Sequence, residues 1–296
     1  MQKVIVIGGG ITGLLVSYYL GGSPTVIEMN STPKNSLNSL WTVIPPLCGE
    51  LREICDSSAR EYQALGSELG TRTSWKEVIR VPPRGDKILS KKETKEIEPM
   101  LEVESEVLGK ALHIHGEALL NRLGRNVLRE KVVGLSVEKD EVIGLKTDRG
   151  SIKGDIYIFA IGSDEQGLFR DLVEIKSYKG HVVVSPPLGI RNVLILDDRL
   201  GVEGFDYALL NGDSYISNDP QVEMEQVEKT LQVFTKYLKR QIEPKEIRVG
   251  FRSVSKTGLP IADKIFENAV LVTGYRFGWA LAPYLAKEAI KLAGIQ

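Results

Sequence analysis

The stretch KVIVIGGGITGLLVSYYLGGSPTVIEMN, residues 3–30, predicts a strand, a tight turn, a helix and a second strand in succession. The run Val4–Ile7 is fully apolar, as in a parallel strand that is buried on both faces. The helix is expected to stop at Gly21, and the second strand, residues 25–27, is followed by Glu28. This order of elements is typical of a dinucleotide-binding fold.

The glycines at 8, 10 and 13 have the spacing G-x-G-x-x-G. The first permits the tight turn, the second lets a pyrophosphate approach the backbone, and the third lets the helix pack closely on the strand. The N–H groups that begin the helix favour a phosphate, and an acid about 20 residues later is placed to bind a ribose and to disfavour NADP. The predicted contacts are Gly8, Gly10, Ile11, Thr12, Gly13, Glu28 and Met29. Spacing alone does not separate NAD from FAD.

Composition excludes several classes of protein. The 296 residues suit one large domain or two interleaved ones, and 42% are hydrophobic. With 38 basic and 39 acidic residues, the chain lacks the basic excess of nucleic-acid-binding proteins. No apolar run approaches the roughly 20 residues of a membrane span, and the short N-terminal run is interpreted as a strand, not a signal peptide. We therefore expect a cytoplasmic protein.

The two cysteines, Cys48 and Cys55, do not form a CxxC pair. The three histidines are dispersed at 113, 115 and 181, so no metal site is predicted. Because a disulfide within a helix is geometrically difficult, we expect reduced thiols, as in other cytoplasmic proteins.

The remainder of the chain predicts further strands and one long amphipathic helix. Residues 126–163 have the pattern of short strands, with turns at 139–140 and 148–150 and a last apolar strand at 156–161. Strands are also predicted within 174–187, 192–198 and 205–219. A helix is predicted within 220–241 from the apolar residues Val222, Val227, Leu231, Phe234 and Leu238. The charged segment 87–104 is interpreted as a solvated helix and loop.

The order of elements resembles the D-amino-acid oxidase-like family of FAD-dependent oxidoreductases, which includes glycine oxidase, sarcosine oxidase and dye-linked proline dehydrogenase. The resemblance spans nearly the whole chain. Its most specific segments, besides the N-terminal unit, are DIYIFAIGS (155–163), YKGHVVV (178–184), GFRSVSKTGLPI (250–261) and VLVTGYRFGWALAP (270–283). It implies an α/β fold: a Rossmann-like FAD-binding domain with an inserted antiparallel-sheet substrate domain.

The resemblance also implies domain boundaries and a cofactor. The FAD-binding domain would comprise 1–72, 112–170 and 246–296, and the substrate domain 73–111 and 171–245. The FAD would be non-covalent, because no His or Cys stands where family members attach the flavin. Further predicted cofactor contacts are Asn38, Ser39, Val132, Val133, Ile161, Gly162, Gly274, Phe277, Gly278, Trp279, Ala280 and Leu281.

Two arginines near the C-terminus are candidate site residues. In the family, an arginine in the position of Arg252 pairs with the substrate carboxylate, for which a guanidinium has the matching planar fork. The alternative is a structural arginine in a surface ion pair. The chain departs from the family pattern after Arg252, where Ser253 replaces a proline and a later aspartate is missing.

Arg276 lies in the segment GYRFGWALAP, which resembles the family's C-terminal loop with Tyr275 in place of a histidine. The helix that follows would direct the positive end of its dipole at the flavin pyrimidine ring. Arg276 would add to that charge, contact the substrate, or be structural. His181 and Tyr207 are candidate substrate contacts, with a structural role as the alternative for each.

The family chemistry implies hydride transfer from the α-carbon of an amino or imino acid, such as a D-amino acid, glycine or a proline-like substrate, to flavin N5. One alternative is a 2-hydroxy-acid or glycerol-3-phosphate dehydrogenase, for which Lys256 would supply a second cation. Another is a non-catalytic FAD-binding subunit, because the pattern after Arg252 has changed. The electron acceptor could be oxygen, another flavoprotein, a partner subunit or a quinone, which would place the protein at a membrane surface. Homo- and hetero-oligomers are both compatible.

Overall fold

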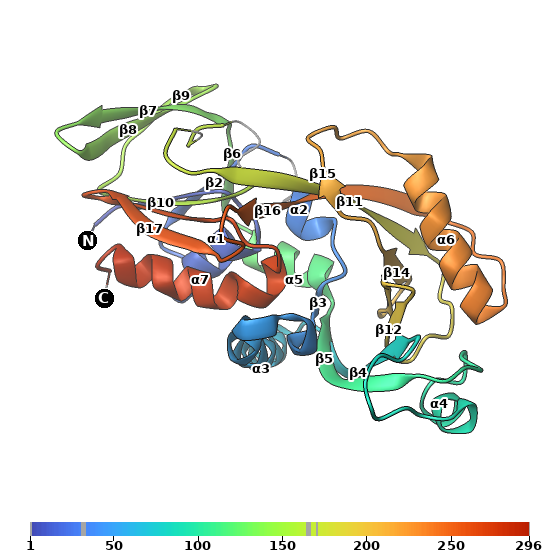
Figure 1. Cartoon of the computed structure of the whole chain (residues 1–296). Helices are drawn as coiled ribbons and strands as arrows, with labels where there is room; N and C mark the ends of the chain where they lie inside the picture. Colours follow the sequence, from blue (N-terminus) through green and yellow to red (C-terminus); the bar gives the residue numbers. More distant parts are fainter. Residues whose placement is uncertain (1, 31–33, 164–166, 170, 296) are drawn as a thin grey trace.

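The computed structural model describes residues 2–30, 34–163, 167–169 and 171–295. Figure 1 shows two large sheets, a six-stranded sheet near both termini and a nine-stranded sheet at the other end of the molecule. The predicted α/β fold with a dinucleotide-binding part and an inserted sheet is confirmed.

The six-stranded sheet is built around β1 (Val4–Ile7). Its order is β17-β18-β10-β1-β2-β6, with β2 (Thr25–Glu28), β6 (Val127–Arg129), β10 (Ile156–Gly162), β17 (Ile261–Phe266) and β18 (Ala269–Thr273). β1 runs parallel to β2 and β10, and Ile7 lies opposite Ile27 and Phe159. The carboxyl ends of these three strands therefore meet at one edge, which is where α/β sheets bind ligands.

Both faces of β1 are covered, which explains its fully apolar sequence. Val4 and Val6 pack with the helices α1 (Ile11–Tyr19) and α7 (Gly278–Leu292). Ile5 and Ile7 pack against a small sheet on the other face. This sheet comprises β7 (Val132–Glu138), β8 (Glu141–Thr147) and β9 (Gly150–Ile152). The predicted run of short strands is confirmed, and Lys139 and Asp140 have positive φ angles in the predicted turn.

The nine-stranded sheet supplies the second half of the molecule. It contains β3 (Thr42–Val43), β4 (Thr73–Val81), β5 (Glu106–Ile114), β11 (Ile175–Ser185), β12 (Val193–Leu196), β13 (Arg199–Glu203), β14 (Ala208–Asn211), β15 (Tyr215–Ile216) and β16 (Glu246–Ser255). Its strands pair antiparallel except β4 and β12, which are parallel. β16 pairs with β11 along ten residues. The proposed domain boundaries, which assign β16 to the FAD-binding domain, stay a prediction.

Helix α6 (Met224–Leu238) covers one face of this sheet through Val227, Phe234 and Leu238. The predicted helix is confirmed, but Val222 precedes it and is 41% exposed, so its assignment to the apolar face was wrong. The charged segment forms α4 (Lys91–Ile97), which begins with a capping box between Ser90 and Glu93, as expected of a solvated helix.

Three helices and two 3₁₀ turns complete the described fold: α2 (Lys34–Leu37), α3 (Arg52–Leu69), α5 (Gly116–Leu123), η1 (Pro45–Leu47) and η2 (Gly49–Leu51). Among the helices of the described residues, none combines the length and apolar composition that a bilayer span requires.

The prediction of free cysteine thiols was wrong. Cys48 and Cys55 form a disulfide, with their Cα atoms 6.7 Å apart. Cys48 lies between the two 3₁₀ turns and outside α3, so the geometric objection to a disulfide within a helix does not apply. The turns reverse the chain and bring Cys48 against the first turn of α3.

Phe234 anchors α6 to the nine-stranded sheet. It is fully buried, and a side chain at Gly201 of β13 would come within 2.4 Å of its ring. We predict that Phe234→Ala lowers the free energy of unfolding by about 3–5 kcal/mol, because it leaves a cavity in the core. Urea denaturation measures this. Gln232→Ala, on the exposed face of the same helix, should change stability by less than about 0.5 kcal/mol.

Candidate functional site

A large cavity lies between the two sheets at the carboxyl ends of β1, β2 and β10. Its volume is about 290 Å³, and it is partly open to solvent. Its lining comes from segments around 8–12, 28–30, 34–48, 160–163, 250–253 and 275–280, with Gly180, Leu200 and Asn211 from the large sheet. Segments far apart in the sequence therefore contribute to one site.

At one end, the glycine turn and Glu28 are held together by hydrogen bonds. Gly9 N–H donates to Glu28 Oε2 at 2.8 Å, and the backbone N–H of Asn30 donates to Oε1 at 2.9 Å. Among the described residues, the hydrogen bonds to this buried carboxylate come from N–H groups of uncharged residues. Glu28 lines the cavity at the end of β2, where it retains acceptor positions for the hydroxyls of a ribose.

Side chains from distant parts of the chain contact the first residues of α1. Ile11 N–H donates to Ser36 Oγ at 2.9 Å, so Ser36 satisfies one of the free N–H groups at the start of the helix. The hydroxyls of Thr12 and Tyr275 are 2.6 Å apart. Burial raises the pKa of Tyr275, which is therefore a neutral hydrogen-bonding group. Tyr275, where the family carries a histidine, links the C-terminal loop to α1.

Two tryptophans position α2 at the edge of the cavity. The indole N–H groups of Trp41 and Trp279 donate to the carbonyl of Ser36, at 3.2 and 3.1 Å. Trp41 also donates to the carbonyl of Leu37 at 3.0 Å. Ser36 and Trp41 line the cavity, and the sequence analysis did not predict either. The sequence feature that could have indicated these two residues was a tryptophan in a polar loop that has no apolar periodicity.

The backbone around the cavity has the shape that an extended dinucleotide requires. A Cβ at Gly13 would lie 2.0 Å from the carbonyl oxygen of Gly8, so α1 approaches β1 as the glycine pattern predicts. A Cβ at Gly162 or at Gly278, the first residue of α7, would meet no atom of the described residues within 4 Å, apart from its own neighbours in the chain. The backbone is thus open toward the cavity at the end of β10 and at the start of α7.

Arg252 projects from β16 into the other end of the cavity. Its Nη1 donates to the backbone carbonyl of Asp213 at 3.4 Å, and Nη2 donates to Asn211 Oδ1 at 3.1 Å. A Cβ at Gly180 of β11 would lie 2.4 Å from Nη1, so the absence of a side chain there makes room for the guanidinium. Burial, and then Arg276, lower the pKa of Arg252, whereas Asp213 raises it.

The two arginines line the cavity, and neither has a carboxylate counter-ion among the described residues. Within residues 2–30, 34–163, 167–169 and 171–295, no carboxylate oxygen lies within 4.0 Å of a guanidinium nitrogen of Arg252 or Arg276. A guanidinium keeps its charge at neutral pH, and the partly buried charge of Arg252 is unfavourable without a partner, whereas Arg276 is exposed. This end of the cavity therefore favours an anion.

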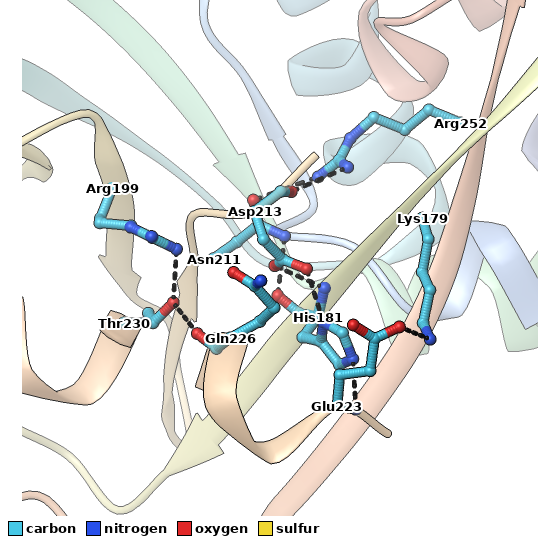
Figure 2. Close-up of polar contacts among 9 residues, drawn as sticks. All are labelled: Lys179, His181, Arg199, Asn211, Asp213, Glu223, Gln226, Thr230 and Arg252. Atoms are coloured by element: carbon cyan, nitrogen blue, oxygen red, sulfur yellow. Dashed lines mark hydrogen bonds and ion pairs between the residues drawn. The ribbon is translucent and has the colours of Figure 1, made fainter. Parts of the chain in front are cut away.

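His181 lies behind Arg252 and not in the cavity lining (Figure 2). Its ring Nδ1 is 2.5 Å from Asp213 Oδ2, and its backbone N–H donates to Asp213 Oδ1 at 2.8 Å. Burial raises the pKa of Asp213, but these hydrogen bonds have the larger combined effect, so its pKa lies below the ordinary value. The predicted substrate contact is instead a buried partner of Asp213.

The structure brings together most of the predicted site residues. Those in the cavity lining are Gly8, Gly10, Ile11, Thr12, Glu28, Met29, Asn38, Ser39, Ile161, Gly162, Arg252, Arg276, Phe277, Gly278, Trp279 and Ala280. Those outside it are Gly13, Val132, Val133, His181, Tyr207, Gly274 and Leu281.

The residues outside the lining have other environments. Val132 is buried beneath β1, and Val133 is 52% exposed on the small sheet. The hydroxyl of Tyr207 donates to Glu117 at 2.8 Å, and burial together with this bond raises the pKa of Tyr207 to about 12. Lys256 is exposed and 3.7 Å from Glu174, so it does not supply a second cation beside Arg252.

Comparison with known proteins identifies the relatives of this chain. A family model described as FAD dependent oxidoreductase matches residues 3–292. Glycine oxidase from Bacillus cereus shares the fold with a TM-score of 0.86 and 18% identity, over 100% of this chain and 96% of that one. L-proline dehydrogenase from P. horikoshii gives a TM-score of 0.83, 17% identity and coverages of 100% and 94%. Iminodiacetate oxidase from Chelativorans sp. gives a TM-score of 0.83 and 18% identity, over 99% of this chain and 96% of that one.

The close approach at Gly13 leads to a prediction for FAD binding. Gly13→Ala places a methyl group against the Gly8 carbonyl, so we expect the variant to lose stability and to bind FAD at least about tenfold more weakly. Gly278→Ala is the matched control for the apoprotein, because its methyl group enters open space. Thermal unfolding of both apoproteins and FAD titration by fluorescence measure the effects. Equal apoprotein stability in the two variants would contradict the prediction.

Proposed function

The chain belongs to the FAD-dependent oxidoreductases of the D-amino-acid oxidase type, and from this premise we propose that it oxidises a small amino or imino acid at the α-carbon. The observation that carries the proposal is Arg252, a guanidinium in the cavity whose two hydrogen bonds go to uncharged oxygens. A substrate carboxylate would supply the missing negative charge and match the planar fork of the side chain.

The other end of the cavity is suited to the adenosine and pyrophosphate of FAD. The start of α1 offers N–H groups and the positive end of a helix dipole, and Glu28 offers ribose acceptors. The start of α7 also lines the cavity, where its dipole favours negative charge. FAD at this site supplies the two-electron acceptor, flavin N5, for a hydride that leaves the substrate α-carbon.

The cavity lining also constrains the substrate amine and side chain. Among the described lining residues, Glu28 carries the one carboxylate, at the nucleotide end. A substrate ammonium or a cationic side chain near Arg252 would therefore lack an acidic partner. We infer that the amine enters uncharged and that the side chain is small and apolar, beside Trp41, Ile44 and Leu200. Such an amine can be oxidised without a protein base at the α-carbon.

The glycerol-3-phosphate alternative has no support from Lys256, whose ammonium group pairs with Glu174. A 2-hydroxy acid would make the same carboxylate contact with Arg252. This contact therefore does not distinguish a hydroxy acid from an amino acid, and an experiment has to decide between them. A non-catalytic subunit would not require a cavity-lining guanidinium that has no carboxylate beside it among the residues described by the structure.

The first experiment is anaerobic addition of candidate substrates to the FAD-loaded protein, followed by its visible spectrum. We expect the flavin absorbance near 450 nm to bleach with glycine, a small D-amino acid or a proline-like acid. Bleaching by 2-hydroxy acids alone would replace the amino-acid proposal with the hydroxy-acid one. A spectrum that no amino, imino or hydroxy acid changes would contradict the enzymatic proposal while leaving FAD binding intact.

Substitution of Arg252 tests the carboxylate contact. Arg252→Ala should weaken substrate binding by about 2–5 kcal/mol, which is roughly 30-fold or more in KM, because it removes the charged partner of a carboxylate. Arg252→Lys keeps the charge but not the fork, so we expect an intermediate effect. Stopped-flow flavin reduction at varied substrate concentration separates KM from the limiting rate. An unchanged KM in Arg252→Ala would contradict this role.

A further inference from the structure

We propose that His181 keeps Arg252 available for substrate by binding the carboxylate of Asp213, which would otherwise form an ion pair with that guanidinium. This inference rests on the proposed function, in which Arg252 binds a substrate carboxylate. His181 is on this view a positioning residue, because it acts on Arg252 through Asp213 and does not contact the cavity.

Asp213 is the link between the two side chains (Figure 2). Its backbone carbonyl accepts a hydrogen bond from Arg252, whereas both carboxylate oxygens accept hydrogen bonds from His181. The carboxylate is 3% exposed and the His181 side chain 1% exposed. Asp213 therefore contacts Arg252 through its backbone carbonyl, while its buried carboxylate is directed away from the guanidinium of Arg252.

The hydrogen-bonding pattern determines which nitrogen of His181 carries the proton. The backbone N–H of Glu223 donates to His181 Nε2 at 3.1 Å. Since a backbone N–H can only donate, Nε2 has no proton, and the proton is on Nδ1, directed at Asp213 Oδ2. Glu223 is itself held by the fully buried Lys179, whose Nζ lies 2.8 Å from Glu223 Oε1.

The contacts of Arg252 show what this arrangement preserves. Asn211 Oδ1 and the Asp213 carbonyl orient the guanidinium without neutralising it. The Asn211 amide also donates to the His181 carbonyl at 2.9 Å, so both groups that hold Arg252 are attached to His181. If the Asp213 carboxylate rotated toward Arg252, a buried ion pair would form and compete with any incoming carboxylate.

Two substitutions of His181 separate its two ring nitrogens. The amide nitrogen of asparagine is separated from Cβ by as many bonds as Nδ1 of histidine is. In His181→Asn, this amide can therefore still donate to Asp213. In His181→Gln, the amide reaches the position of Nε2, so the Glu223 contact is kept. The side-chain contact with Asp213 Oδ2 is lost, and only the backbone N–H of residue 181 still donates to Asp213 Oδ1. The double variant His181→Gln/Asp213→Asn removes the competing negative charge and leaves the Asp213 backbone carbonyl in place.

The binding assay uses propionate as the probe carboxylate and propanamide as its uncharged isostere, both titrated into FAD-loaded protein and followed by the visible spectrum. We expect His181→Gln to raise the dissociation constant of propionate by about tenfold. His181→Asn and the double variant should stay within about threefold of wild type. With a substrate, the loss in His181→Gln should appear in KM, with the limiting rate nearly unchanged.

The guanidinium is also observed directly, without substrate or FAD, by NMR of protein labelled with ¹⁵N-arginine. The Arg252 side-chain signal is assigned from its absence in Arg252→Lys. It should shift in His181→Gln, when the Asp213 carboxylate pairs with it, and return toward its wild-type position in the double variant. Thermal unfolding of each variant verifies that it is folded.

The possible results are distinct. If the double variant binds propionate as weakly as His181→Gln and shows the same NMR shift, the carboxylate is not the competitor and the inference is overturned. If both single His181 variants behave like wild type, His181 has no positioning role. If Arg252→Ala binds propionate as well as wild type does, the proposed function fails, and this inference with it. If wild type itself does not distinguish propionate from propanamide, Arg252 does not recognise the carboxylate charge, and the proposed function fails together with this inference.

Discussion

The positive charge on Arg252, which has no carboxylate within ion-pair distance in the part of the chain that the structure describes, is the constraint on which the substrate end of this molecule depends. An amide and a backbone carbonyl accept two hydrogen bonds from the guanidinium, and neither group carries a charge. Gly180 leaves the space that the guanidinium occupies. An uncompensated charge destabilises the protein without ligand, and the same charge contributes binding free energy when an anion enters. The stability that offsets it comes from other parts of the chain, such as the α6 core.

The nucleotide end shows the complementary arrangement. Here the carboxylate of Glu28 is buried with N–H donors, and the start of α1 adds a positive dipole end. The segment 34–41 joins the two ends, because Ser36 contacts α1 and the two tryptophans, while Asn38 donates to the carbonyl of Val249 on β16 at 2.7 Å. The two ends of the cavity are therefore held in a fixed relation by one short segment, which a reaction between a flavin and a substrate requires.

The sequence allowed prediction of those parts of the site that depend on local pattern. The strand Val4–Ile7, the glycine turn and Glu28 lie within one short unit, and their physical roles follow from spacing. Arg252 was predicted from a resemblance between segments, and the structure places it in the cavity. By contrast, Ser36 acts through contacts with Ile11 and Trp279, which lie far from it in the sequence. No periodicity records such contacts.

His181 illustrates the difference between a correct neighbourhood and a correct role. Its position in β11 indicated the sheet that faces the cavity, but alternation along the strand did not reveal that its partner would be Asp213, 32 residues later. Likewise, Asp213 on its own would look like a counter-ion for a nearby arginine. The side-chain geometry reverses that expectation, since the carboxylate contacts His181 and only the backbone carbonyl contacts Arg252. In a cavity that must bind an anion, the placement of a neighbouring acid away from the arginine is as important as the arginine itself.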